Sequence, residues 1–213
     1  ITVDCGISDV EQIAYARSIG MDTIVLDHHE ISDQLPAAVA CINPNRSDCA
    51  FPFKNLAGVG IAFNFLIALR GTLRKEGFWK DGQYPNLREY LDIVALGTIG
   101  DIAPLIDENR IFARIGLELL TEGKRPGIKA LKEVSGIDGQ LIDSFKASFC
   151  LIPRINAAGR IASPLDAVDL LLSETLEEAR PLAEKLDLHN RRRQAMEKDI
   201  LKEILGQLGT NPD

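Results

Sequence analysis

Two short apolar segments near the N-terminus, joined by a helical pattern, constrain the fold of this chain more than any other feature. Residues 1–3 and 23–26 have the β-branched, apolar composition of buried strands. Between them, Ser8 and Glu11 have the spacing of a capping box, and Gly20 suits the left-handed conformation that follows a helix. Two strands connected through one short helix run parallel. The chain is therefore predicted to open with a parallel α/β unit.

Acidic residues and histidines follow these two strands. Asp4 ends the first strand, and Asp27, His28 and His29 end the second. The carboxyl ends of parallel strands meet at one edge of the sheet, which is where open α/β sheets bind ligands. We therefore expect these side chains to lie close together. The alternative is a pair of surface histidines in a loop and a turn-capping aspartate, which would explain each residue taken alone.

The remainder of the chain is predicted to be mainly helical. A third strand is expected at residues 37–42, before a turn of sequence Asn-Pro-Asn. Apolar spacing predicts helices at residues 57–73, 86–96, 108–121, 127–134, 141–150 and 164–172. A last long helix should begin at a capping box formed by Thr175 and Glu178 and run towards Leu208. Pro181 should kink this helix or delay its start.

A further acidic residue lies in a glycine-punctuated segment, residues 97–105, which is expected to be a loop. Asp101 lies beside Gly97 and Gly100, where backbone can approach a ligand closely. Taken alone, Asp101 could equally cap a helix. Together, three carboxylates and two histidines at successive segment ends suit a divalent ion such as Mn²⁺, and a two-metal phosphoryl-transfer site needs such a set.

Arginines gather at two places in the second half of the chain. Arg154 and Arg160 flank the small residues of the sequence PRINAAGR, and their guanidinium groups suit phosphate oxygens. The alternative is a loop with solvated charges. Residues 191–193 are three consecutive arginines, for which a solvated helix face is the expected structure and contact with nucleic acid the alternative.

Composition excludes several classes of function. A net charge of −7 argues against a surface that coats nucleic acid, so positive charge would have to be concentrated in ions or a few arginines. The 4 cysteines include no CxxC pair, so neither a disulfide framework nor a zinc ribbon is predicted, and a reduced, cytoplasmic setting is expected. No apolar run approaches the roughly 20 residues that cross a bilayer. Trp79 and the phenylalanines are expected in the core rather than as base-stacking platforms.

Five segments together resemble the DHH phosphoesterase family, and they occur in that family's order: TVDCGIS, VLDHHE, NLAGVGIAF, LDIVALGTIGDIAPL and PRINAAGR. VLDHHE and GTIGDIAPL mark the broad family, whereas PRINAAGR and DIVALGT are similar to its RecJ branch of single-strand-specific DNA exonucleases. The resemblance implies an α/β fold, with the parallel sheet of the DHH domain followed by a mainly helical part. Residues 1–174 would form the DHH core, and residues 175–213 a linker helix towards a C-terminal domain.

The resemblance also implies roles for individual residues. Asp4 would be shared between two Mn²⁺ or Mg²⁺ ions, and His28 and Asp101 would be further metal ligands. His29 would act as a catalytic residue that faces the scissile phosphate, and Asp27 would orient the histidine pair. The side chains implied to bind the phosphate backbone of single-stranded DNA are those of Arg154, Asn156 and Arg160.

The implied activity is metal-dependent phosphodiester hydrolysis by a 5′-to-3′ exonuclease on single-stranded DNA in recombination and repair. Single-strand-binding protein or a helicase would be partner proteins. The family's first motif, an acidic DxD-type segment, would precede Ile1, so we expect this chain alone to bind one ion or none and to lack nuclease activity. Cys5 stands where relatives commonly have Asn.

Two other functions stay open at this point. One is a DHH-type phosphodiesterase of oligoribonucleotides or cyclic dinucleotides, against which the segment PRINAAGR argues. The other is a non-enzymatic, DHH-derived scaffold of a replication complex, against which the retained acids and histidines argue.

Overall fold

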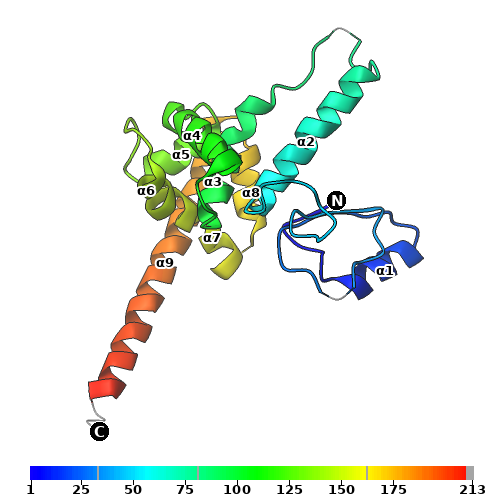
Figure 1. Ribbon diagram of the computed structural model, residues 1–213. Helices are drawn as coiled ribbons and strands as arrows, with labels where there is room; N and C mark the ends of the chain where they lie inside the picture. The colour runs from blue at the N-terminus through cyan, green and yellow to red at the C-terminus, as the bar shows by residue number, and fades with distance from the viewer. Residues whose placement is uncertain (33, 81, 162, 210–213) are drawn as a thin grey trace. The chain divides into compact units, whose positions relative to one another are not determined.

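The computed structural model describes residues 1–32, 34–80, 82–161 and 163–209 (Figure 1), and the predicted parallel sheet is present in it. Its strands lie in sequence order, and both neighbouring pairs are parallel: β1 (Thr2–Val3), β2 (Ile24–Leu26) and β3 (Ala40–Ile42). Leu26 pairs with Val3 on one side and with Ile42 on the other, so the strands end level with one another. Residues that follow the strands therefore meet at one edge, and the predicted α/β opening is confirmed.

Helix α1 (Val10–Ser18) connects β1 to β2. Gly20 has a φ of +82°, the left-handed conformation predicted for it. The predicted capping box does not form, because the helix begins at Val10 with Asp9 at the N-cap position and no side chain caps it. Ser8 thus lies one residue too early to cap the helix. The buried side chains beneath this unit are Ile7, Ile13 and Val25.

Larger helices complete the first of two compact units, Ile1–Leu119. Helix α2 (Gly58–Lys75) packs on β1 and β2. A short 3₁₀ helix, η1 (Leu87–Tyr90), leads into α3 (Leu91–Gly100), and α4 (Asp107–Glu122) follows. The main apolar core of this unit contains Leu26, Leu56, Ile61, Phe63, Leu91, Val94 and Phe112.

The glycine-punctuated segment is not a loop in its first part, so this prediction was wrong. Helix α3 continues through Gly97 and Gly100, and Asp101 is its C-cap. A Cβ at Gly97 would come within 2.7 Å of Val59 Cγ1. Gly97 therefore reflects the close packing of α2 against α3, which outweighs the low helix propensity of glycine.

The second unit, Leu120–Asp213, consists of helices in the part that the structure describes. They are α5 (Pro126–Val134), α6 (Ser144–Lys146), a π-helical turn η2 (Ala147–Leu151), α7 (Ile152–Ile161), α8 (Leu165–Leu172) and α9 (Leu176–Gly209). Residues 153–160 lie in α7, so the loop that we considered for them is absent. Across the described ranges of both units, no helix is long and apolar enough to cross a membrane.

Helix α9 begins at the predicted capping box. Glu178 N donates to Thr175 Oγ1 over 3.2 Å, and Glu178 Oε2 accepts from Thr175 N over 3.3 Å. Pro181 lies inside the helix and does not delay its start. The first half of α9 packs against α5, α7 and α8 and buries Ala179, Ala183 and Leu186. Residues 194–207 are exposed and extend beyond these helices (Figure 1, orange to red). A linker role for α9 stays a prediction.

Aromatic residues follow the predicted burial only in part. Trp79 is half-buried, and Phe53, Phe63 and Phe112 belong to the core. Three phenylalanines are instead 65% exposed: Phe78, Phe145 and Phe149. Assigning all phenylalanines to the core was therefore wrong. Phe145 and Phe149 lie in short helical segments, whose apolar spacing does not reveal which face is covered, and Phe78 lies in the loop after α2.

Candidate metal centre

The three residues predicted as metal ligands meet at the sheet edge of the first unit. Asp4 directly follows β1, His28 lies just after β2, and Asp101 caps the C-terminus of α3. His28 Nε2 lies 3.0 Å from Asp4 Oδ1 and 3.7 Å from Asp101 Oδ2. The structure thus brings two carboxylates and one imidazole together from three different elements.

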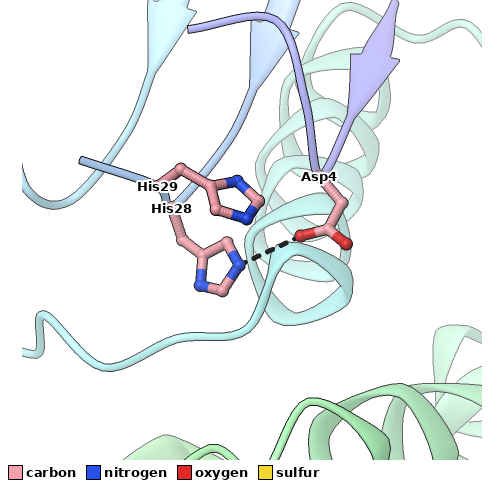
Figure 2. Close-up of side chains that lie close together, drawn as sticks. All are labelled: Asp4, His28 and His29. Atoms are coloured by element: carbon pink, nitrogen blue, oxygen red, sulfur yellow. Dashed lines mark ion pairs between the residues drawn. The ribbon is translucent and has the colours of Figure 1, made fainter. Parts of the chain in front are cut away.

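His29 joins the same group. One ligand atom from each of Asp4, His28 and His29 lies within 4.8 Å of the other two. Figure 2 shows both imidazole rings on the side of the chain that faces Asp4, and their centroids are 4.6 Å apart. Consecutive side chains of a continuing strand would point to opposite faces. The chain turns after β2, and this turn allows both histidines to face one site.

Asp27 holds the histidine pair through hydrogen bonds to its carboxylate. It is 1% exposed and accepts hydrogen bonds from the backbone N–H groups of Ile7 (2.9 Å), His28 (2.8 Å) and His29 (3.2 Å). His29 Nδ1 also donates to it over 2.7 Å. Burial alone would raise the pKa of Asp27, but these hydrogen bonds, led by that of Ile7, together lower it. Asp27 is therefore an ionised acceptor that fixes the His29 ring and leaves Nε2 for the site.

The pKa of His29 is raised from its ordinary value. The main cause is the hydrogen bond to Asp27; burial opposes it, and the negative charges of Asp27, Asp4 and Asp101 add to it. The His29 side chain is 59% exposed. The His29 imidazole is therefore easier to protonate than a free histidine, and it is open to solvent.

Gly58, at the start of α2, makes room for Asp4, and sequence reasoning missed this role. A Cβ at position 58 would meet the Asp4 carboxylate. Asp4 itself has a φ of +64°, a left-handed conformation that is uncommon outside glycine and is found at functional sites. The only signal in the sequence was the glycine pair of the segment LAGVG.

Two asparagines hold the backbone of the histidines, and sequence reasoning treated them only as a turn. Asn43 Nδ2 donates to the His29 carbonyl over 3.0 Å, and Asn45 Nδ2 donates to the His28 carbonyl over 2.6 Å. Asn43 Oδ1 accepts from Asn45 N over 2.8 Å. Both residues follow β3, the strand beside β2.

The donor set fits a divalent cation. His28 Nε2 is a buried atom without a hydrogen-bond partner among the described residues, although Asp4 Oδ1 is only 3.0 Å away. The close approach therefore brings these atoms together without a hydrogen bond between them. An imidazole nitrogen with carboxylate oxygens suits Mn²⁺, and carboxylates suit Mg²⁺. A cation would satisfy His28 and offset the negative charge of both aspartates.

The predicted phosphate-binding residues lie in the second unit, and there Arg154 is already paired. Its Nε and Nη2 both lie 2.9 Å from Asp187 Oδ1, and its Nη1 donates to the Cys150 carbonyl over 2.5 Å. Arg191 holds the other oxygen of Asp187 at 2.7 Å. With 15% of its side chain exposed, Arg154 is not the solvated charge that we considered as the alternative.

The other two predicted phosphate-binding residues differ from Arg154. Asn156 is exposed on α7. The side chain of Arg160 lies outside the described residues. Contact of these side chains with phosphate stays a prediction, as does that of Arg154.

Comparisons with known proteins agree with the resemblance in the sequence. Residues 1–98 match the model of the DHH family, N-terminal domain. The chain is 48% identical over 208 residues to the single-stranded-DNA-specific exonuclease RecJ of Escherichia coli (strain K12), and 42% identical over 205 residues to that of Bacillus subtilis (strain 168). Each alignment covers 96% of this chain, but only 36% and 24% of those relatives. The chain thus spans about a third of the length of the former.

Solved structures show the same fold. The crystal structure of RecJ in complex with Mn²⁺ from Thermus thermophilus has a TM-score of 0.82 at 33% identity, covering 97% of this chain and 30% of that one. The corresponding structure with Mg²⁺ has a TM-score of 0.73 at 31% identity, covering 96% of this chain and 27% of that one.

Proposed function

Because this chain belongs to the DHH family of phosphoesterases, and to its RecJ branch, we propose that it carries the metal-binding part of an exonuclease that hydrolyses single-stranded DNA from its 5′ end. The observation that carries the proposal is the convergence of Asp4, His28 and Asp101 at one sheet edge. Relatives with 48% and 42% identity are exonucleases specific for single-stranded DNA. The 5′-to-3′ direction and the place in recombination and repair follow from the family resemblance.

The three converging side chains would hold the cation. Asp4 is fixed for this task, because its backbone N–H donates to the Leu26 carbonyl over 2.9 Å and its carboxylate packs against Gly58. His28 offers Nε2, and Asp101 offers a carboxylate from the end of α3. Bound there, Mn²⁺ or Mg²⁺ would supply a Lewis acid for phosphate oxygens and an activated water.

His29 would act on the phosphate itself. Its raised pKa favours the imidazolium form, which can donate a hydrogen bond to a phosphate oxygen and stabilise the charge that develops there. Asp27 holds the ring through Nδ1, so Nε2 is the nitrogen that would face the substrate. Asp27 would thus be a positioning residue that acts through His29.

Contact with the DNA backbone would come from α7. Asn156 presents an exposed amide, and Arg160 would add a positive charge. Arg154 could bind a phosphate only by giving up Asp187, with which it now pairs. We therefore place Arg154 last among the three in expected contribution to DNA binding.

The decisive experiment measures hydrolysis of 5′-labelled single-stranded DNA by the complete natural protein, with Mn²⁺, with Mg²⁺ and with EDTA. We expect His28→Ala and Asp101→Ala to lower hydrolysis to the level seen with EDTA, because each removes a ligand. Glu118→Gln, which changes an exposed acid on α4, is the matched control and should keep full activity.

The outcomes separate the alternatives. Undiminished hydrolysis by His28→Ala would contradict the metal-centred mechanism. Faster hydrolysis of dinucleotides than of long single strands would favour the phosphodiesterase of short substrates. Absence of hydrolysis and of Mn²⁺ binding in the unaltered protein would favour the scaffold.

A further inference from the structure

We propose that Asn43 and Asn45 form a clamp that positions the two histidines of the metal centre. The proposal rests on the proposed function, because it assigns these asparagines a task in the same site. They follow β3, whereas the histidines follow β2, so the clamp joins two neighbouring strand ends.

The geometry of Asn43 is defined by both ends of its amide. Nδ2 donates to the His29 carbonyl, and Oδ1 accepts from the backbone N–H of Asn45. A backbone N–H can only donate, so the orientation of the amide is unambiguous. Asn43 is 2% exposed, and a buried amide with two hydrogen bonds has little freedom to move.

The clamp completes the hydrogen bonding of the histidine backbone. The last sheet hydrogen bond on this strand runs from Asp27 N to the Ile42 carbonyl. Beyond it, Asp27 accepts from the N–H groups of His28 and His29, and Asn45 and Asn43 bind their carbonyls. All four backbone polar groups of the histidine pair are thus held by side chains rather than by the sheet.

This arrangement determines where the imidazoles lie. His28 Nε2 must stay between the carboxylates of Asp4 and Asp101, at 3.0 and 3.7 Å (Figure 2 shows the former contact). In the described part of the chain, no sheet hydrogen bond holds the backbone of His28 and His29, so a rotation of their peptide groups would carry both rings away from Asp4. The asparagine clamp opposes this rotation. Metal ligands tolerate a displacement of about 0.5 Å before affinity suffers.

The sharpest test is Asn43→Asp in the complete natural protein. Aspartate keeps the oxygen that accepts from Asn45 N, but it replaces the donor to His29 with an oxygen that repels the carbonyl. Asn45→Asp makes the same change opposite His28. Asn64→Asp is the charge-matched control, because Asn64 lines the same cavity of about 430 Å³ as Asn43.

Four quantities are measured for each variant: the Mn²⁺ concentration that gives half-maximal hydrolysis, kcat at saturating Mn²⁺, KM for single-stranded DNA, and the melting temperature. We expect Asn43→Asp to raise the half-maximal Mn²⁺ concentration by about 10- to 100-fold, the usual effect of losing a partner that orients a metal ligand. KM should not change, and excess Mn²⁺ should restore most of kcat. Asn45→Asp should have a smaller effect in the same direction, since Asn45 is exposed.

The added charge works against the expected result, because a carboxylate near the site attracts a cation. The proposal would be overturned if the half-maximal Mn²⁺ concentration of Asn43→Asp were lower than that of the unaltered protein. It would also be overturned if this concentration were equal to that of Asn64→Asp. A merely structural role would lower the melting temperature and kcat at every Mn²⁺ concentration without shifting the half-maximal point. If Asn43→Asp fails to fold, Asn45→Asp decides, since its side chain is on the surface. Failure of the proposed function would show itself separately, as absence of hydrolysis in the unaltered protein.

Discussion

The metal centre and helix α7 carry residues that look equally suited to phosphodiester chemistry, yet the structure treats them differently. At the sheet edge, Asp4 and His28 come together because each follows one of two neighbouring parallel strands that end level with each other. On α7, the direction of Arg154 depends on which helix packs against it, and α9 supplies Asp187. Strand ends therefore reveal a site more directly than charges on a helix do.

The two regions also differ in how their charges are balanced. In the metal centre, His28 Nε2 is buried and has no hydrogen-bond partner among the described residues, and acids surround it. On α7, Arg154 has Asp187 and the Cys150 carbonyl. A buried polar group without a hydrogen-bond partner indicates a ligand, whereas polar groups that pair with one another indicate packing.

The largest effect that would sharpen this contrast is expected for Asp187→Ala. It leaves the largely buried Arg154 without its carboxylate, and breaking a buried pair on one side costs about 3–5 kcal/mol. Urea unfolding of the chain measures the change. The matched control is Glu133→Ala, which breaks the exposed pair of Glu133 with Arg180 (3.0 Å) and should cost no more than about 1 kcal/mol. Equally small losses in the free energy of unfolding of both variants would mean that the pair of Arg154 with Asp187 does not serve packing.

A second prediction concerns the close approach at the metal centre. In Gly58→Ala the new methyl group meets the Asp4 carboxylate, so we expect overpacking of about 1–3 kcal/mol and weaker binding of Mn²⁺, measured by calorimetry on the complete natural protein. Gly71→Ala, in the same helix α2, has nothing within 4 Å of the new methyl group and should slightly stabilise the protein. Unchanged Mn²⁺ affinity in Gly58→Ala would show that Asp4 is not held in place by α2.

Much of the first unit could be predicted because its structure follows from residues that lie close together in the sequence. Apolar segments, a connecting helix and the parallel rule place the residues after β1 and β2 at one edge without knowledge of the rest of the chain. A helix at residues 86–96 was predicted, but its continuation through Gly97 and Gly100 to Asp101 was not. Glycine is a poor helix former in isolation, and only the contact of Gly97 with Val59 explains its place in α3.

The parts that escaped prediction depend on partners far away in the chain. Asn43 reads as a turn residue in the sequence, and its role appears only once β3 lies beside β2. Arg154 and Asp187 are separated by 33 residues, and no spacing rule selects that carboxylate over the others on α9. The side chain that completes a contact is chosen by tertiary packing, which the pattern of a single segment does not contain.

The smallest expected effect tests the exposed side of α7. Asn156→Ala removes an uncharged amide that would donate one hydrogen bond to a charged phosphate, so binding of single-stranded DNA by the complete natural protein should weaken by about 1.5 kcal/mol with an unchanged salt dependence. Arg160→Ala removes a charge instead and should lower the slope of log affinity against log salt concentration by about 1. Fluorescence anisotropy over a series of salt concentrations distinguishes the two. Unchanged affinity for Asn156→Ala together with an unchanged slope for Arg160→Ala would remove α7 from the DNA path and leave its polar residues, Arg154 among them, to serve packing.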